Sequence, residues 1–162
     1  MAFKPSGHPL HPPATHFALA LPCAGAVFDA VSIWRPVPHW PAAAFLCIAA
    51  GLAAAAAALI AGMIDSVRFG CLDEHLPART SSLFVRHISL ALLGEAAFGA
   101  SLWLRAGFTA PTPPAALACS AAGAVLLLAA GWHGGELVYS AGIGVRHSPP
   151  DETAAGPGNN GA

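Results

Sequence analysis

Long apolar segments separated by short polar ones dominate the pattern of the chain. A helix that spans a bilayer needs roughly 20 apolar residues in succession. Four segments come close to this length, and we expect spans at about 17–33, 42–64, 88–104 and 115–132. The alternating positions of a β-barrel strand do not appear, and alanine runs such as Ala53–Ala58 favour helix.

The segments between these spans predict how neighbouring helices are joined. Residues 34–41 and 105–114 are short and rich in proline, whereas 65–87 is the longest polar stretch. Short connections of this kind join neighbouring helices as antiparallel pairs. We therefore predict an all-α fold, an integral membrane four-helix bundle with antiparallel neighbouring spans, over residues 1–147. The tail 148–162 carries proline, glycine, asparagine and two acids, and we expect it to be disordered.

The composition excludes several classes of protein. The chain is 56% hydrophobic and 9% charged, against about 25% charged residues in soluble domains. So few charges cannot cover the surface of a water-soluble globule of 162 residues. The formal net charge of -1 offers no basic field for nucleic acid. The lipid bilayer is the expected partner, together with a subunit of a membrane complex or a second copy of the chain.

The basic residues predict the orientation in the membrane. With four spans, both termini and the middle connection share one side, which carries five basic residues: Lys4, Arg68, Arg79, Arg86 and Arg146. The other side carries two, Arg35 and Arg105. Basic residues gather on the cytoplasmic side of inner-membrane proteins. We expect a multi-pass protein of the bacterial inner (plasma) membrane with both termini in the cytoplasm.

Seven of the eight histidines fall at this same end of the predicted bundle, and only His39 falls at the other. Five polar residues near helix ends could meet there at a similar depth: His16, Asp65, His87, His133 and Glu136. A plainer interpretation remains open, because helix ends are wet and carry polar residues without binding anything.

Two acids lie within predicted spans. Glu95 is seven residues past Ile88, about 11 Å along a helix. A carboxylate at that depth must be neutral or partnered, for example by a hydrogen bond to Ser32, Ser120 or a neighbouring backbone group. Asp29 lies near the end of the first span, which favours a role at the membrane boundary.

Two short motifs stand at the ends of the apolar region. His8-Pro9-Leu10-His11-Pro12-Pro13, followed by His16, could hold a metal, or its prolines could fix the entry into the first helix. Near the C-terminus lies Gly134-Gly135-Glu136-Leu137-Val138-Tyr139. This motif is neither a phosphate-binding loop nor a nucleophile elbow. No nucleophile–base pair has motif support, so the sequence favours a protein that is not an enzyme.

Together these motifs resemble a bacterial family of predicted four-helix membrane proteins, known as domain of unknown function 2231. The resemblance covers about residues 8–146 and rests on the histidine–proline motif, Asp29, Gly62-Met63-Ile64-Asp65, His87, and the Gly134–Tyr139 motif followed by Gly142-Ile143-Gly144-Val145. The chain departs from the family pattern at Ala18, where proline is usual, and at Ala141, where histidine is common. The resemblance implies a membrane protein and no settled activity.

Three functions therefore compete. The first is a small accessory or scaffold subunit whose polar residues form a structural cluster at one membrane face. The second is an electron-transfer protein that binds haem b through His16 and His87, with His133 as a further candidate. The third is binding or transport of a transition-metal ion by His8, His11, His16, Asp65 and Glu136.

Overall fold

The computed structural model describes residues 9–68 and 76–145. These residues form four helices and no strand: α1 (His11–Trp34), α2 (His39–Arg68), α3 (Ala78–Trp103) and α4 (Pro114–Tyr139). All four are long and apolar enough to cross a membrane. The predicted all-α class and the four membrane helices are confirmed. The predicted disordered tail, 148–162, lies outside the described residues.

Each helix extends beyond the apolar segment from which it was predicted. α1 begins at His11, six residues before Phe17, and α3 begins at Ala78, ten residues before Ile88. These added turns carry histidine, arginine and hydroxyl side chains. They form helix although they are too polar to count toward a bilayer span. As a result, the polar residues at this end stand on helical turns, which fix their positions.

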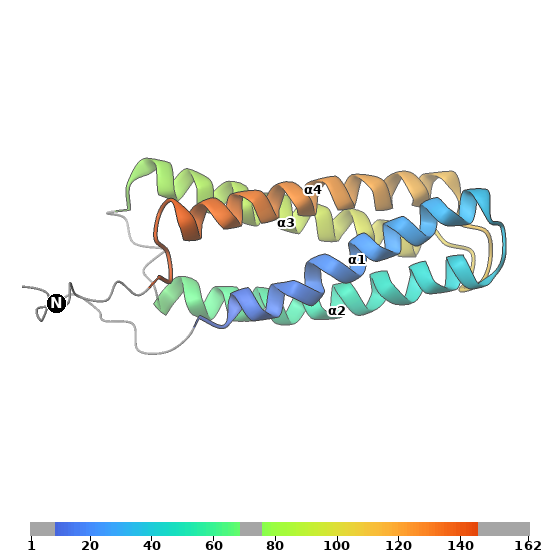
Figure 1. The fold of residues 1–162 in the computed structure, drawn as a ribbon, viewed down its shortest axis with the longest axis horizontal. Helices are drawn as coiled ribbons and strands as arrows, with labels where there is room; N and C mark the ends of the chain where they lie inside the picture. The colour runs from blue at the N-terminus through green and yellow to red at the C-terminus, as the bar shows by residue number, and fades with distance from the viewer. Residues whose placement is uncertain (1–8, 69–75, 146–162) are drawn as a thin grey trace, which may run out of the picture.

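The four helices are arranged as two pairs. α1 packs mainly against α2, and α3 mainly against α4, while contacts between the pairs are fewer. Figure 1 shows the α1–α2 and α3–α4 connections together at one end, here called the loop end. The start of α1 and the end of α4 lie at the opposite end, here called the terminal end.

Small residues bring the two helices of a pair close together. A Cβ added to Gly94 of α3 would lie 2.8 Å from Leu127 and 3.2 Å from the carbonyl oxygen of Gly123 on α4. A Cβ added to Gly123 would lie 2.8 Å from Phe98 and 3.1 Å from the Gly94 carbonyl oxygen. The two backbones therefore pack at a distance that only glycine allows. In the first pair, Gly51 of α2 packs against Pro22 of α1 in the same way.

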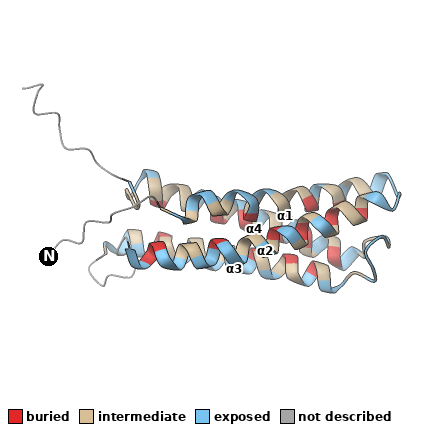
Figure 2. Cartoon of the chain, turned by 90° about the horizontal axis from the view of Figure 1, so that it is seen from below, coloured by how far each residue is buried: buried red, intermediate tan, exposed pale blue. Residues whose placement is uncertain are grey.

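Most of the apolar surface faces outward. Only 17–28% of the residues in the apolar window of each helix are buried inside the bundle. The buried core is formed by Ile48, Phe98 and Leu127, one each from α2, α3 and α4. Figure 2 shows buried positions interspersed among exposed ones along every helix. This distribution suits a protein whose outer faces contact lipid.

Candidate functional site

A buried ion pair occupies the loop end. Arg105, just after α3, donates from its two terminal nitrogens to the two carboxylate oxygens of Asp29 on α1, at 2.6 and 3.0 Å. The side chains of Arg105 and Asp29 are 3% and 2% exposed. A forked arginine–carboxylate contact of this kind is among the strongest polar contacts in proteins.

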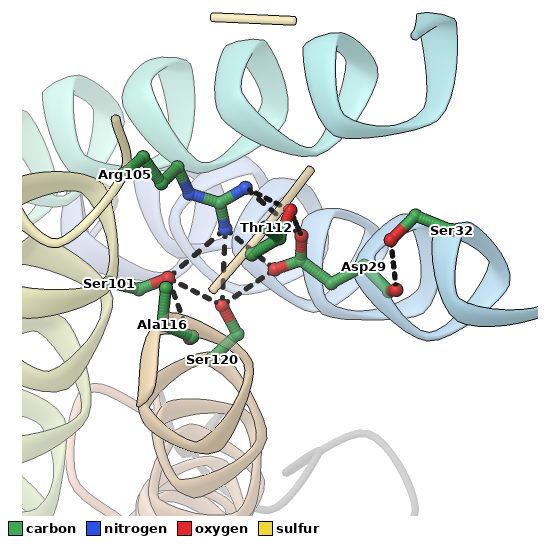
Figure 3. A network of polar contacts seen from close by, with 7 residues as sticks. All are labelled: Asp29, Ser32, Ser101, Arg105, Thr112, Ala116 and Ser120. Carbon is green, nitrogen blue, oxygen red and sulfur yellow. Dashed lines mark hydrogen bonds and ion pairs between the residues drawn. The ribbon is translucent and has the colours of Figure 1, made fainter. Parts of the chain in front are cut away.

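Two hydroxyl groups complete the surroundings of Asp29. Ser120 of α4 donates to one carboxylate oxygen at 2.8 Å, and Thr112 of the α3–α4 connection donates to the other at 3.1 Å. The carboxylate thus receives four donors, about the number its lone pairs can accept. Figure 3 shows this network, in which Ser101 of α3 also accepts from Arg105 at 3.0 Å and lies 2.8 Å from Ser120.

The network joins the two helix pairs at the loop end. Asp29 belongs to the first pair, whereas Ser101 and Ser120 belong to the second and Arg105 follows α3. With its carboxylate saturated by donors, Asp29 holds the pairs together. The structure places Asp29 in a buried network with Arg105, a contact that no sequence pattern indicates.

The two serines expected to bond Glu95 form hydrogen bonds with Asp29 instead. Ser120 donates to Asp29, and Ser32 donates to the backbone oxygen of Asp29 at 2.6 Å. Within the described residues, neither serine is hydrogen-bonded to Glu95. The Oε2 atom of Glu95 is buried and has no hydrogen-bond partner among the described residues.

At the terminal end, Asp65 of α2 caps the start of α1. Its Oδ2 atom accepts the backbone N–H groups of Leu10 and His11 at 2.6 and 2.7 Å. The first four N–H groups of a helix have no partner within it, and here the next two residues, Pro12 and Pro13, have none to offer. Asp65 therefore satisfies both available donors, and it joins α1 to α2.

Two histidines, one from each helix pair, lie next to each other at this end. The rings of His11 on α1 and His87 on α3 have centroids 5.9 Å apart and are nearly perpendicular, at 86°. Nδ1 of His11 bonds the carbonyl oxygen of Ala58 on α2, and Nδ1 of His87 bonds that of Ala130 on α4, each at 2.9 Å. Each ring is thus fixed by the other helix of its own pair.

Among the described residues, the remaining predicted ligands do not complete a metal-binding group with this pair. His16 is exposed, and its Nδ1 bonds the carbonyl oxygen of Pro13 at 3.1 Å. His133 and Glu136 face each other along α4, with Nδ1 and Oε2 3.6 Å apart. Residues 9–68 and 76–145 contain no group of three or more His, Cys, Asp or Glu that could hold a metal. His8 lies outside the described residues.

The glycines of the C-terminal motif have separate roles. A Cβ on Gly134 would lie 3.0 Å from the His87 ring, so this glycine makes room for the imidazole, whereas Gly135 has only Tyr139 near it, at 4.0 Å. Tyr139, the last residue of α4, is 90% exposed. Beyond it, Gly142 and Gly144 have φ of 68° and 75°, which favour glycine and turn the chain out of the helix.

Four long apolar helices, with polar networks at both ends of the bundle, define a multi-pass helical membrane protein. The chain belongs to the family described as "Predicted membrane protein (DUF2231)", whose model matches residues 7–147. The resemblance noted from the sequence motifs is thereby confirmed. No curated protein and no solved structure matches the chain.

Proposed function

We propose that this protein is a small accessory or scaffold subunit of the bacterial inner membrane, which works by associating with a partner inside the bilayer. Residues 1–147 form its four-span domain, and both termini lie in the cytoplasm. The orientation rests on the excess of basic residues, five against two, on the side that holds the termini.

The observation that carries this proposal is the outer face of α2. Its exposed side chains in the middle of the helix are small: Ala50, Ala53, Ala56 and Ala57. Larger side chains, Leu46 and Ile60, are exposed on either side of them, at 57% and 62%. In lipid, small residues let a second helix approach closely and gain van der Waals contact. The alanine face of α2 is therefore suited to a partner helix.

The loop-end network supports a structural role. The Asp29 carboxylate receives four donors and is 2% exposed. A saturated, buried carboxylate holds helices in place and is poorly suited to moving protons or binding a substrate. We assign this network to assembly of the subunit.

The test is the mass of the particle extracted in mild detergent, measured by native mass spectrometry. We expect assemblies heavier than one chain of 16.3 kDa, and loss of association in Ala53→Trp. The matched control is Leu128→Trp, at an exposed position of α4, which should leave the assembly intact. Masses at whole multiples of the chain mean self-association, and other masses mean a different subunit. A monomeric wild type, or an Ala53→Trp variant that assembles normally, contradicts the proposal.

Haem binding through His16 and His87 finds less support than this role. His16 is exposed on α1 and bonds within its own first turn, whereas the imidazole next to His87 is that of His11.

A further inference from the structure

We propose that His11 and His87 form a two-imidazole site for one transition-metal centre, held between the two helix pairs at the terminal end. This inference does not depend on the accessory role. It rests on how the two rings are anchored, how far apart they lie, and which other ligands surround them.

The anchoring sets the tautomer of both rings. A carbonyl oxygen can only accept a hydrogen bond, so Nδ1 of His11 carries the proton that it donates to Ala58, and Nδ1 of His87 carries the one donated to Ala130. In a neutral ring, Nε2 then holds the lone pair. Histidines that bind metals usually have this arrangement, in which one nitrogen bonds a backbone carbonyl and the other faces the metal.

The two helix pairs repeat the same arrangement. In each pair, the ring bonds the carbonyl of an alanine on the opposite helix and packs against the glycine four residues further on. A Cβ on Gly62 would lie 2.8 Å from His11, and one on Gly134 would lie 3.0 Å from His87. Both imidazoles are therefore seated before any ligand arrives, and little ordering is needed on binding.

The separation of the rings fits one metal between them. Imidazoles bound on opposite sides of a metal, with metal–nitrogen bonds of about 2.0–2.1 Å, have ring centroids about 6.3 Å apart, because each centroid lies about 1.1 Å behind the bound nitrogen. The centroids of His11 and His87 are 5.9 Å apart. The two rings belong to different helix pairs, so a metal between them would join the pairs at the terminal end.

The ligand count decides the kind of metal centre. A closed zinc site needs four protein ligands. Asp65 lies next to His11, where it accepts the backbone N–H of that residue, but the described part of the chain holds no group of three or more His, Cys, Asp or Glu that could bind a metal. Two imidazoles suffice where a macrocycle supplies the remaining ligands, as in haem iron, or where the metal accepts two ligands, as Cu(I) does. The shared chemistry is a metal that takes two neutral imidazole nitrogens.

The experiment uses the full chain, purified in mild detergent and titrated separately with haemin and with Cu(I). We expect one equivalent to bind in one of the two titrations. Binding of haemin gives an intense Soret absorption band typical of two axial imidazoles. Binding of Cu(I) is followed by competition with a coloured chelator. The titration in which binding is seen shows whether the site takes haem iron or a copper ion.

Glutamine variants keep these tests interpretable. In His11→Gln and His87→Gln, the amide can still donate to the backbone carbonyl but offers no ligand nitrogen, so the fold is retained and affinity falls at least 100-fold. His16→Gln is the matched control, because His16 also bonds a backbone carbonyl from α1 and lies outside the pair. It should bind as the wild type does.

His87→Met adds a spectroscopic test in the haemin arm. Methionine is also an axial ligand of haem iron, so this variant should bind with the spectrum of a histidine–methionine pair. The proposal is overturned if the folded wild type binds neither haemin nor Cu(I). It is equally overturned if both glutamine variants bind with wild-type affinity.

Discussion

The ion pair between Asp29 and Arg105 is buried and therefore needs hydrogen bonds from the residues around it. The two side chains are 2% and 3% exposed and lie 2.6 Å apart, so both charges have left water. Such a pair is stable only when hydrogen bonds satisfy the remaining atoms. Ser101, Thr112 and Ser120 do this, while Nε of Arg105 has no partner among the described residues.

Removing one member of this pair should cost far more than removing both. Arg105→Met leaves the Asp29 carboxylate buried without its counter-charge, and we expect a loss of about 3–5 kcal/mol in the free energy of unfolding. In the double variant Asp29→Leu/Arg105→Met no charge remains buried, and most of this loss should be recovered. Unfolding by SDS, followed by circular dichroism in mild detergent, measures both.

Arg35→Met provides the control for this comparison. Arg35 is exposed at the same end of the bundle, and its loss should change stability by less than about 0.5 kcal/mol. If Arg105→Met is as stable as Arg35→Met, the ion pair does not hold the helix pairs together.

The sequence pointed to several of the important residues but did not show which of them are in contact. Asp29 stood out as an acid inside a span, and Arg105 as a basic residue of a connection, yet they are separated by 76 positions in the sequence and no pattern joins them. The haem hypothesis names His16 with His87 because these residues head the first and third predicted spans at a similar depth. His11, whose ring lies next to that of His87 in the structure, is five residues before His16 on α1. Five residues turn a helix through about 140° beyond a full turn, so the two side chains face different ways.

Hydropathy along the chain predicts well that each of the four helices exists, but it predicts poorly where each helix begins and ends. All four helices were found because each contains an apolar segment long enough to span lipid. The polar turns that extend α1 and α3 were missed, because they are held by contacts between helices. The start of α1, for instance, is capped by Asp65 of α2, which no local pattern around residue 11 encodes.

The close approach of α3 and α4 gives a test at this scale. Gly94→Ala places a methyl group 3.2 Å from the carbonyl oxygen of Gly123 and 2.8 Å from Leu127, so the helices must move apart. We expect a loss of about 1–3 kcal/mol in unfolding free energy, measured by SDS titration.

Gly99→Ala on the same helix is the matched control. A Cβ there meets nothing within 4 Å, and alanine favours helix over glycine by about 1 kcal/mol. This variant should be as stable as the wild type or more so. Equal stability of the Gly94 and Gly99 variants would mean that α3 and α4 are not packed on their glycines.

The distribution of basic residues along the whole chain predicts on which side of the membrane each terminus and each connection lies. A reporter fused after Ala162 and another inserted within residues 69–75 should both be active in the cytoplasm, because five of the seven basic residues belong to that side. A reporter inserted at Gly107, in the α3–α4 connection, should lie outside. Cytoplasmic fluorescence and periplasmic phosphatase activity distinguish the two. Finding the first two reporters in different compartments would refute the four-span topology.

The anchoring of each imidazole by its own helix pair has a consequence for how the molecule is built. At the terminal end, each half of the chain holds its own histidine ring. The ring of His11 bonds a carbonyl of α2, in the half that ends at Arg68, and the ring of His87 bonds a carbonyl of α4, in the half that begins at Ala78. Neither ring nitrogen bonds a backbone carbonyl of the other helix pair. Each half of the chain therefore contains the backbone groups that hold its own histidine ring. We expect the two halves, expressed as separate polypeptides, to associate in the bilayer and form the four-helix bundle.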